Sequence, residues 1–197
     1  TGNPVRADIA DVEPVQVPKD GPVNVLVLGG SQGAAFLNDL VPLALAALGE
    51  DVALKITHQC GQAHLQVTEE RYAQRHVAAR VTPFIDDMAA AYQWADLVVC
   101  RSGALTVSEL MVTGTASILV PLPHAIDDHQ TENARILSES GAGCLLPQNS
   151  SLEPQLSDLL KAFIASPQRL EIMAGNARRL AMPNAAAAVA EVIEGVS

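Results

Sequence analysis

Residues 23–34 read VNVLVLGGSQGA and carry the clearest structural pattern of the chain. A compact run rich in Val and Leu ends in Gly29-Gly30, and a helical pattern follows from about Gly33 to Leu48. The run is apolar on both faces, which is typical of a strand buried in a parallel sheet. The stretch therefore predicts a strand, a tight glycine turn and a helix that packs back onto the sheet.

The same order of strand and helix recurs along the chain. We expect strands at residues 23–28, 52–57, 80–82, 97–100, 117–120 and 144–146. We expect helices at residues 33–48, 64–75, 86–94, 105–112, 131–138, 156–165, 168–180 and 185–192. This alternation predicts an α/β fold, namely a Rossmann-like doubly wound parallel sheet with right-handed crossovers. Ligands of such sheets bind where the strands end, near the point at which the strand order reverses.

The composition excludes several classes of protein. The 197 residues suffice for one large domain with a buried core, and 49% of them are hydrophobic, which argues against disorder. Only 3% are aromatic, so the core must consist mainly of Val, Leu, Ile and Ala. The net charge of −10 repels phosphate backbones and argues against a non-specific nucleic-acid binder. No apolar run reaches the roughly 18 residues of a membrane span.

The cysteines and the first residues bear on compartment and domain organisation. Cys60, Cys100 and Cys144 fit no metal or redox motif, so we expect small buried hydrophobic side chains in a reducing compartment. Residues 1–22 contain four prolines and are expected to form an extended lead-in or interdomain linker before a domain at 23–197. The chain begins with Thr rather than Met, so we expect it to be a piece of a longer protein.

The glycine turn suits an anion. Gly29 and Gly30 permit positive φ, Ser31 offers a hydroxyl, and a helix N-terminus attracts negative charge. The alternative is a tight turn that needs glycine only for packing. The dinucleotide fingerprint is incomplete, because Ser31 replaces its second glycine and the next strand ends without an acidic residue. The Lys of a P-loop is also missing, so NAD binding and ATP hydrolysis are disfavoured.

A second turn, at Ser102-Gly103, precedes a helix that we expect to begin near Ala104. Glu109 lies about one turn into this helix. A carboxylate that accepts two adjacent hydroxyls is a usual way to hold a ribose. The alternative is an acidic residue that only stabilises the start of the helix.

Two further loops are polar or lie at strand ends. His124, Asp127, Asp128 and His129 invite interpretation as a metal site, but the last three are adjacent and point in different directions. The segment can instead bind a polar substrate such as a sugar, or be a solvated loop with Asp127 or Asp128 as a helix cap. In the loop after the third strand, Ile85 can offer its backbone to a flat base or belong to the core, and Asp86 suits an N-cap.

Together these loops resemble one family closely, that of the peptidoglycan glycosyltransferase MurG, which has the GT-B fold. The motifs that carry the resemblance are residues 2–6 (GNPVR), 29–34 (GGSQGA), 84–88 (FIDDM), 95–109 (ADLVVCRSGALTVSE) and 129–134 (HQTENA). They occur in the family's order and span nearly the whole chain.

The resemblance implies that residues 23–197 are the C-terminal, UDP-sugar-binding lobe of an inverting hexosyltransferase in peptidoglycan synthesis. That family transfers N-acetylglucosamine from UDP-GlcNAc to a muramyl-pentapeptide lipid, with no metal or other cofactor required. The N-terminal lobe, absent from this chain, is expected to bind the lipid acceptor and to supply the base and the membrane contact. The expected location is the bacterial cytoplasm, on the cytoplasmic face of the inner membrane.

The resemblance also implies site residues. Substrate-binding positions are Arg6, Ser31, Ile85, Ala104, Leu105, Thr106, Val107, Ser108, Glu109 and Gln130. Further candidates are Gly30, Gln32, Gly33, Gly103, His129 and Asn133, with His129 standing where some relatives have a second Gln. The chain alone is expected to bind the donor without transferring the sugar.

Three other functions stay open. The chain could belong to another GT-B protein such as a UDP-sugar epimerase, which shares the sheet and the nucleotide loops. It could be a non-catalytic donor-binding subunit that needs a partner chain. It could also be a metal hydrolase built on His124, Asp127 and His129.

Overall fold

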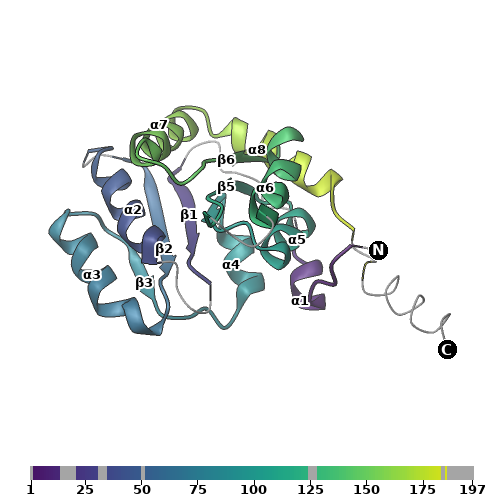
Figure 1. Ribbon diagram of the computed structural model, residues 1–197, viewed down its shortest axis with the longest axis horizontal. Helices are drawn as coiled ribbons and strands as arrows, with labels where there is room; N and C mark the ends of the chain where they lie inside the picture. The colour runs from purple at the N-terminus through teal and green to yellow at the C-terminus, as the bar shows by residue number, and fades with distance from the viewer. Residues whose placement is uncertain are drawn as a thin grey trace.

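The computed structural model describes residues 2–13, 21–30, 35–49, 52–123, 128–182 and 185. Within them lies a parallel sheet of six strands in the order β3-β2-β1-β4-β5-β6 (Figure 1). The strands are β1 (Val23–Leu28), β2 (Leu54–Gln59), β3 (Arg80–Thr82), β4 (Leu97–Cys100), β5 (Ala116–Leu119) and β6 (Gly143–Leu145). The order reverses between β1 and β4, as in a doubly wound sheet, so the predicted fold class is confirmed.

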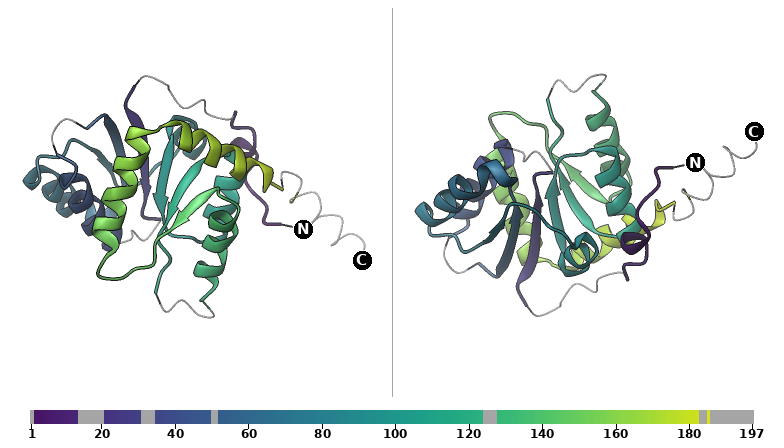
Figure 2. Two further views of the ribbon diagram at one scale, coloured as in Figure 1. Left: turned by 90° about the horizontal axis from the view of Figure 1, so that it is seen from above. Right: turned by 90° about the horizontal axis from the view of Figure 1, so that it is seen from below.

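Helices cover both faces of the sheet (Figures 1 and 2). The helices are α1 (Ala7–Ala10), α2 (Ala35–Ala46), α3 (Leu65–Gln74), α4 (Met88–Trp94), α5 (Ala104–Thr113), α6 (His129–Glu139), α7 (Leu152–Ala165) and α8 (Gln168–Arg179), with a short 3-10 helix at Gln62–His64. Buried side chains of α2, α3 and α7 pack on one face, and those of α1, α4, α5 and α6 pack on the other. None of the helices in the described ranges is long and apolar enough to cross a membrane.

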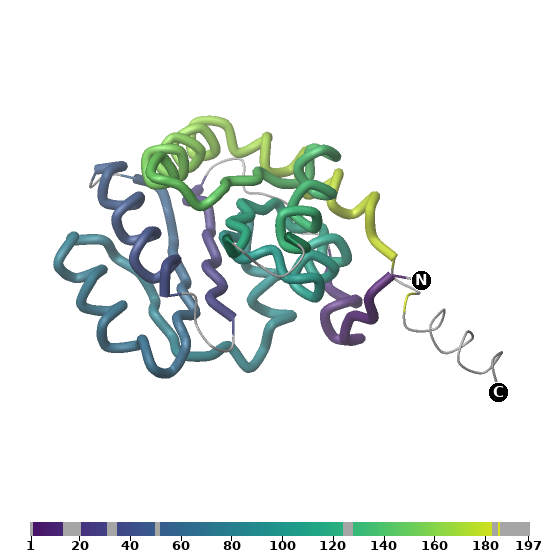
Figure 3. The backbone as a smooth tube through the Cα atoms, in the orientation of Figure 1, coloured from purple at the N-terminus to yellow at the C-terminus, as the bar shows by residue number. Residues whose placement is uncertain are grey.

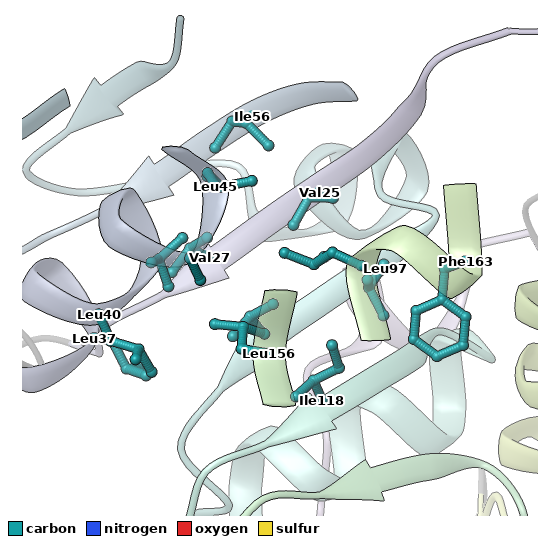
Figure 4. Close-up of a cluster of buried hydrophobic side chains, with 14 of the residues drawn as sticks. Val25, Val27, Leu37, Leu40, Leu45, Ile56, Leu97, Ile118, Leu156 and Phe163 are labelled. Atoms are coloured by element: carbon teal, nitrogen blue, oxygen red, sulfur yellow. The ribbon is translucent and has the colours of Figure 1, made fainter. Parts of the chain in front are cut away.

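The core explains why β1 has no polar face. Val25 and Val27 point into the cluster beneath α2 and α7, and Leu26 and Leu28 point into the cluster on the opposite face. Figure 4 shows Val25 and Val27 beside Leu156 of α7 in the first cluster. Because both sides of the strand are buried here, both alternating sets of side chains are apolar, and the half-buried Asn24 near its start is the exception.

Most predicted elements are confirmed, and the shifted ends have physical causes. Strands β1, β3 and β4 have the predicted bounds, whereas β2 begins and ends two residues later than expected. The parallel pairing of Leu28 with Gln59 extends β2 through polar residues whose side chains find partners. Helix α7 begins four residues before the predicted start, because Pro154 lies in its first turn, where no helical N–H bond is needed.

Two caps differ from the expected ones. The N-cap of α4 is Asp87 rather than Asp86, and the Asp87 carboxylate accepts a 2.9 Å hydrogen bond from the Ala90 amide. Asp128 does occupy the N-cap position of α6, but its carboxylate accepts from the Thr131 hydroxyl at 2.6 Å instead of from a backbone amide. The predicted helix at 185–192 lies outside the described residues except for its first position.

The expectation of an extended N-terminal segment is wrong in part, because the segment contains helix α1. Ile9 and Val12 are buried, and Ile9 joins the core cluster of α4 and α5. Ile9 and Val12 are three positions apart and so lie on one face of a helical turn. This spacing indicates a helix, but the four prolines of the segment led to the prediction of an extended chain. The segment lies beside the chain that follows α8 (Figure 3). Gly2 lies against Met182 there. The boundary between linker and domain near residue 22 stays a prediction.

Candidate functional site

A cavity of about 220 Å³ lies at the carboxyl ends of β1 and β4, where the strand order reverses. Its lining comes from the ends of β1, β2 and β4, from the loops after β1, β3 and β4, and from helices α4 and α5. The lining residues are Leu28, Gly29, Gly30, Gln59, Phe84, Ile85, Met88, Cys100, Arg101, Thr106 and Glu109. This is the position at which doubly wound sheets bind their ligands.

Glu109 is the acidic side chain among the residues that line the cavity, and a buried partner fixes it. The Tyr92 hydroxyl donates a 2.8 Å hydrogen bond to Glu109 Oε2. Burial raises the pKa of Tyr92 well above its usual range, and the negative charge of Glu109 raises it further. The phenol therefore keeps its proton and remains a donor. A carboxylate has about four acceptor positions, so this bond leaves acceptor capacity for two ligand hydroxyls.

The start of α5 presents backbone amides at the same edge. Gly103 is the N-cap residue, and Ala104 begins the helix, as predicted. The first amides of a helix have no carbonyl partner within it and carry a partial positive charge. A β-carbon added at Gly103 would meet no atom within 4 Å, so the space above this turn is open to a ligand. Ala104 and Leu105 are exposed there, and Thr106 lines the cavity.

Two predicted site residues on α5 support the helix from its buried side. Val107 packs in the core cluster behind α5. The Ser108 hydroxyl donates to the Ala104 carbonyl at 2.9 Å and accepts from the Asn3 side chain at 3.3 Å. Their side chains therefore hold α5 in place, while Thr106 and Glu109 face the cavity.

The turn after β1 is held by the end of β2. Gly30 has φ +75° and lines the cavity. The Gly30 N–H donates to Gln59 Oε1 at 3.1 Å, and Gln59 Nε2 donates to the Gly30 carbonyl at 3.0 Å. Because both backbone groups of Gly30 are taken, this residue shapes the cavity and its amide is not free for an anion. The candidates Ser31, Gln32 and Gly33 lie outside the described residues.

Ile85 combines the two roles that the sequence left open. Its side chain packs against the core cluster of α4 and α5, and the residue also lines the cavity. Its neighbour Phe84 is 59% exposed at the rim. The loop after β3 thus supplies an apolar part of the cavity lining.

The start of α6 is joined to the turn before α5. The Ser102 hydroxyl donates to the Gln130 carbonyl at 2.7 Å, and the Asn133 side chain donates to the Ser102 carbonyl at 3.1 Å. The Leu122 amide donates to Gln130 Oε1 at 3.0 Å, so Gln130 can offer a ligand its Nε2 donor group. His129 begins α6 and is exposed. These residues adjoin the α5 start but do not line the cavity.

The structure does not bring Arg6 to the cavity. This side chain is exposed at the start of α1 and forms a 3.1 Å ion pair with Asp8. Asn3 of the same segment does contact α5, through the Ser108 hydroxyl.

Sequence reasoning missed the roles of Gln59 and Arg101. Arg101 donates to the carbonyls of Val120 and Pro121 at 3.0 and 2.9 Å, and to the Gln148 side chain at 3.0 Å. Burial lowers the pKa of this guanidinium. Arg101 thus ties together the loops after β4, β5 and β6. The signal that could have found both residues is their position at strand ends.

The remaining lining residue of note is Cys100, a free thiol like the other two cysteines. Burial raises the pKa of Cys100 to about 12, so it stays a neutral apolar lining. The expected role of the cysteines as small buried side chains holds for Cys60 and Cys100, while Cys144 is half-buried.

The described part of the chain contains no group of three or more His, Cys, Asp or Glu side chains that could hold a metal ion. His124 and Asp127, on which the metal hydrolase depended, lie outside the described residues.

A second, larger hollow of about 750 Å³ lies on the sheet face over β2 and β3 beside α4. Lys55, Arg80 and Trp94 line it, and it shares Phe84 and Ile85 with the smaller cavity. The smaller cavity, by contrast, is lined by the glycine turn after β1 and by the first turns of α5. We therefore place the candidate site in the smaller cavity.

Similar proteins carry names that agree with this site. A UDP-N-acetylglucosamine--N-acetylmuramyl-(pentapeptide) pyrophosphoryl-undecaprenol N-acetylglucosamine transferase of Xylella fastidiosa (strain M12) is 50% identical over 196 residues, covering 98% of this chain and 54% of that protein. The protein of the same name from Cellvibrio japonicus (strain Ueda107) is 52% identical over 195 residues, covering 97% and 54%. The chain thus spans about half the length of the curated relatives it matches.

Among solved structures, the chain is similar to the crystal structure of Acinetobacter baumannii MurG. The TM-score is 0.87 at 41% identity, and the match covers 95% of this chain and 55% of that one. The model of the glycosyltransferase family 28 C-terminal domain matches residues 24–190, which include the whole sheet except Val23, the first residue of β1. The chain therefore belongs to the family of glycosyltransferase family 28 C-terminal domains.

Proposed function

We propose that the chain is the UDP-GlcNAc-binding half of an inverting glycosyltransferase that transfers N-acetylglucosamine to the muramyl-pentapeptide lipid of peptidoglycan synthesis. The observation that carries the proposal is Glu109, held by Tyr92 in a cavity at the β1/β4 switch point beside the start of α5. The names of the relatives supply the identity of the sugar donor and of the acceptor.

Each part of the donor has a matching wall. The uracil packs at Ile85, and the ribose hydroxyls donate to Glu109, since both residues line the cavity. At about 220 Å³ the cavity is smaller than the roughly 300–1,000 Å³ of sites that enclose a whole ligand. The diphosphate therefore extends from the mouth of the cavity, between the turn at Gly30 and the first amides of α5 at Gly103, with the Ser31 hydroxyl as a further donor. The sugar extends toward Gln130.

The chemistry is a displacement at the anomeric carbon of the sugar. The acceptor hydroxyl oxygen forms the new bond, the bond to the diphosphate oxygen breaks, and UDP leaves with the electron pair. The helix-start amides at Ala104 stabilise the negative charge that grows on the diphosphate, because they are already oriented toward it. The proton of the acceptor hydroxyl goes to a base that we assign to an N-terminal lobe.

The proposal fixes the partners. The chain works with an N-terminal lobe that binds the lipid acceptor and carries the contact with the cytoplasmic face of the inner membrane. The chain alone binds the donor but does not transfer the sugar. Transfer to the lipid acceptor by the isolated chain would contradict this division of labour.

The test is calorimetric titration with UDP-GlcNAc, UDP and NAD. We expect both uridine compounds to bind and NAD not to bind. The Glu109→Ala variant should weaken UDP binding by about 1–3 kcal/mol, the effect of removing a buried hydrogen-bond partner. Glu153→Ala, which removes an exposed glutamate in the first turn of α7, is the matched control and should bind as the wild type does. Equal affinity of all three proteins for UDP would refute the assignment.

A further inference from the structure

The end of β2 makes an unusual contact with the glycine turn. Gln59 is the last residue of β2 and is only 5% exposed, although its side chain is polar. Its backbone carbonyl accepts from the Gly29 amide at 2.9 Å. Its carboxamide then exchanges two hydrogen bonds with the backbone of Gly30, at 3.1 and 3.0 Å.

The carboxamide of Gln59 acts as one more peptide group of the strand. A side-chain amide has the same donor and acceptor as a backbone peptide, so the paired bonds continue the β1–β2 ladder one residue beyond the strand end. The ladder thereby includes Gly30, whose φ of +75° lies in a region that glycine shares with few other residues. Glycine is the most flexible residue of an unfolded or loop segment, so two added bonds restrict it strongly.

The support of Gln59 is itself rigid. The neighbouring His58 is fully buried, with its ring nitrogens 2.8 Å from the Tyr72 hydroxyl of α3 and 3.0 Å from Asn38 Oδ1 of α2. Asn38 also donates to the Cys60 carbonyl at 3.0 Å. The end of β2 is therefore bound to α2 and α3, and Gln59 transmits that fixed position to the turn after β1.

We propose that Gln59 is a positioning residue for the diphosphate part of the ligand. Its role is to fix the backbone of Gly30, and hence the cavity wall after β1, before the ligand arrives. Both polar groups of Gln59 are used by Gly30, so it acts through the turn rather than as the ligand's principal contact. The inference rests on the proposed binding of a uridine diphosphate sugar and names the side chain that prepares the site for it.

The position also explains how this sheet differs from a dinucleotide-binding one. In dinucleotide-binding sheets an acidic residue at the end of the second strand holds the ribose. Here the last residue of the second strand, Gln59, is a neutral amide that is hydrogen-bonded to the backbone of the glycine turn. The ribose is left to Glu109 on α5, on the other side of β1.

The test compares uridine with UDP, because only UDP carries the diphosphate. In Gln59→Met, which keeps the volume but removes both hydrogen bonds, we expect the dissociation constant for UDP to rise about tenfold, as expected for the loss of about 1.4 kcal/mol of preorganisation. The dissociation constant for uridine, followed by NMR titration, should change less than about twofold. A general loss of structure would weaken both ligands equally, which is the outcome that would overturn the proposal.

A second variant keeps the test decisive if Gln59→Met folds poorly. In Gln59→Glu the new carboxylate cannot donate to the Gly30 carbonyl at neutral pH, whereas its protonated form restores both bonds. UDP affinity relative to the wild type should therefore rise as the pH falls from 7.5 to 5. A constant ratio across this range would contradict the role of the donor bond.

The amide of Gly30 provides a readout in the absence of ligand. Its hydrogen exchange should be slow in the wild type and at least tenfold faster in Gln59→Met, because the bond to Oε1 is lost. If the wild type binds UDP and Gln59→Met binds it equally well, the inference fails and the proposed function stands. If the wild type does not bind UDP, both the proposed function and the inference about Gln59 are wrong.

Discussion

Acidification should destabilise the fold through His58. The imidazole is fully buried between Tyr72 and Asn38. Burial lowers the pKa of His58 from 6.5 to about 4. In the unfolded chain the ring is solvated and takes up a proton near pH 6.5, so between these two values the unfolded state binds the proton that the folded state refuses.

The sign and the size follow from the two pKa values. The contribution to stability is fully present above pH 6.5 and is lost as the pH falls from 6.5 toward 4. One pKa unit corresponds to about 1.4 kcal/mol of free energy. Acidification can therefore remove at most about 3 kcal/mol of unfolding free energy through the lowered pKa of His58, most of it by pH 4.5. That is a large part of the roughly 5–15 kcal/mol that stabilises a typical domain.

Urea unfolding followed by circular dichroism measures this loss. We compare the wild type with His58→Gln at pH 7.5, 6.5, 5.5 and 4.5, because glutamine does not titrate. Other groups, including Asp96, whose pKa burial raises, contribute to both proteins and cancel in the difference. The wild type should lose about 2–3 kcal/mol relative to the variant between pH 7.5 and 4.5.

A difference that does not change with pH would refute this reasoning. So would a wild type that gains stability relative to the variant on acidification, since that would require a charged His58 in the folded protein. His76→Asn, which removes an exposed histidine at positive φ, controls for the loss of one imidazole.

Three further predictions concern the site and its frame. Tyr92→Phe removes the donor to Glu109, so UDP affinity in calorimetry should fall about three- to tenfold; unchanged affinity would show that Glu109 needs no partner. Gly103→Ala should leave the melting temperature unchanged, since φ −63° and ψ 147° suit alanine and no atom lies within 4 Å of the new methyl. The same variant should bind UDP more weakly in calorimetry, because the methyl takes up space that we assign to the diphosphate. Gly114→Ala should cost about 1–2 kcal/mol in urea unfolding, because φ is +66° and the methyl would lie 3.3 Å from the Ala174 carbonyl, with UDP affinity preserved below the unfolding transition.

The sheet could be predicted because its signals are local. Each strand is a short apolar run between polar or glycine-containing loops, and strands β1, β3 and β4 have the expected bounds. The position of Glu109 at the cavity also followed from local pattern, since a helix start after a strand end points its first turn at the switch point.

The missed features depend on partners that are distant in the chain. Gln59 bonds to a residue 29 positions away, and Arg101 bonds to Gln148, 47 positions away. A polar residue at a strand end looks the same in the sequence whether it faces solvent, a ligand or another turn. Helix α1 was missed for a similar reason, because its Ile9 becomes a core residue only when α4 and α5 are in place.

The most direct test of the central claim is a crystal structure of the chain with UDP-GlcNAc. We predict uracil against Ile85, ribose hydroxyls within hydrogen-bonding distance of Glu109, and the diphosphate over the start of α5. The larger hollow offers two cations, Lys55 and Arg80, to a diphosphate, and ligand density there would contradict the assignment of the site.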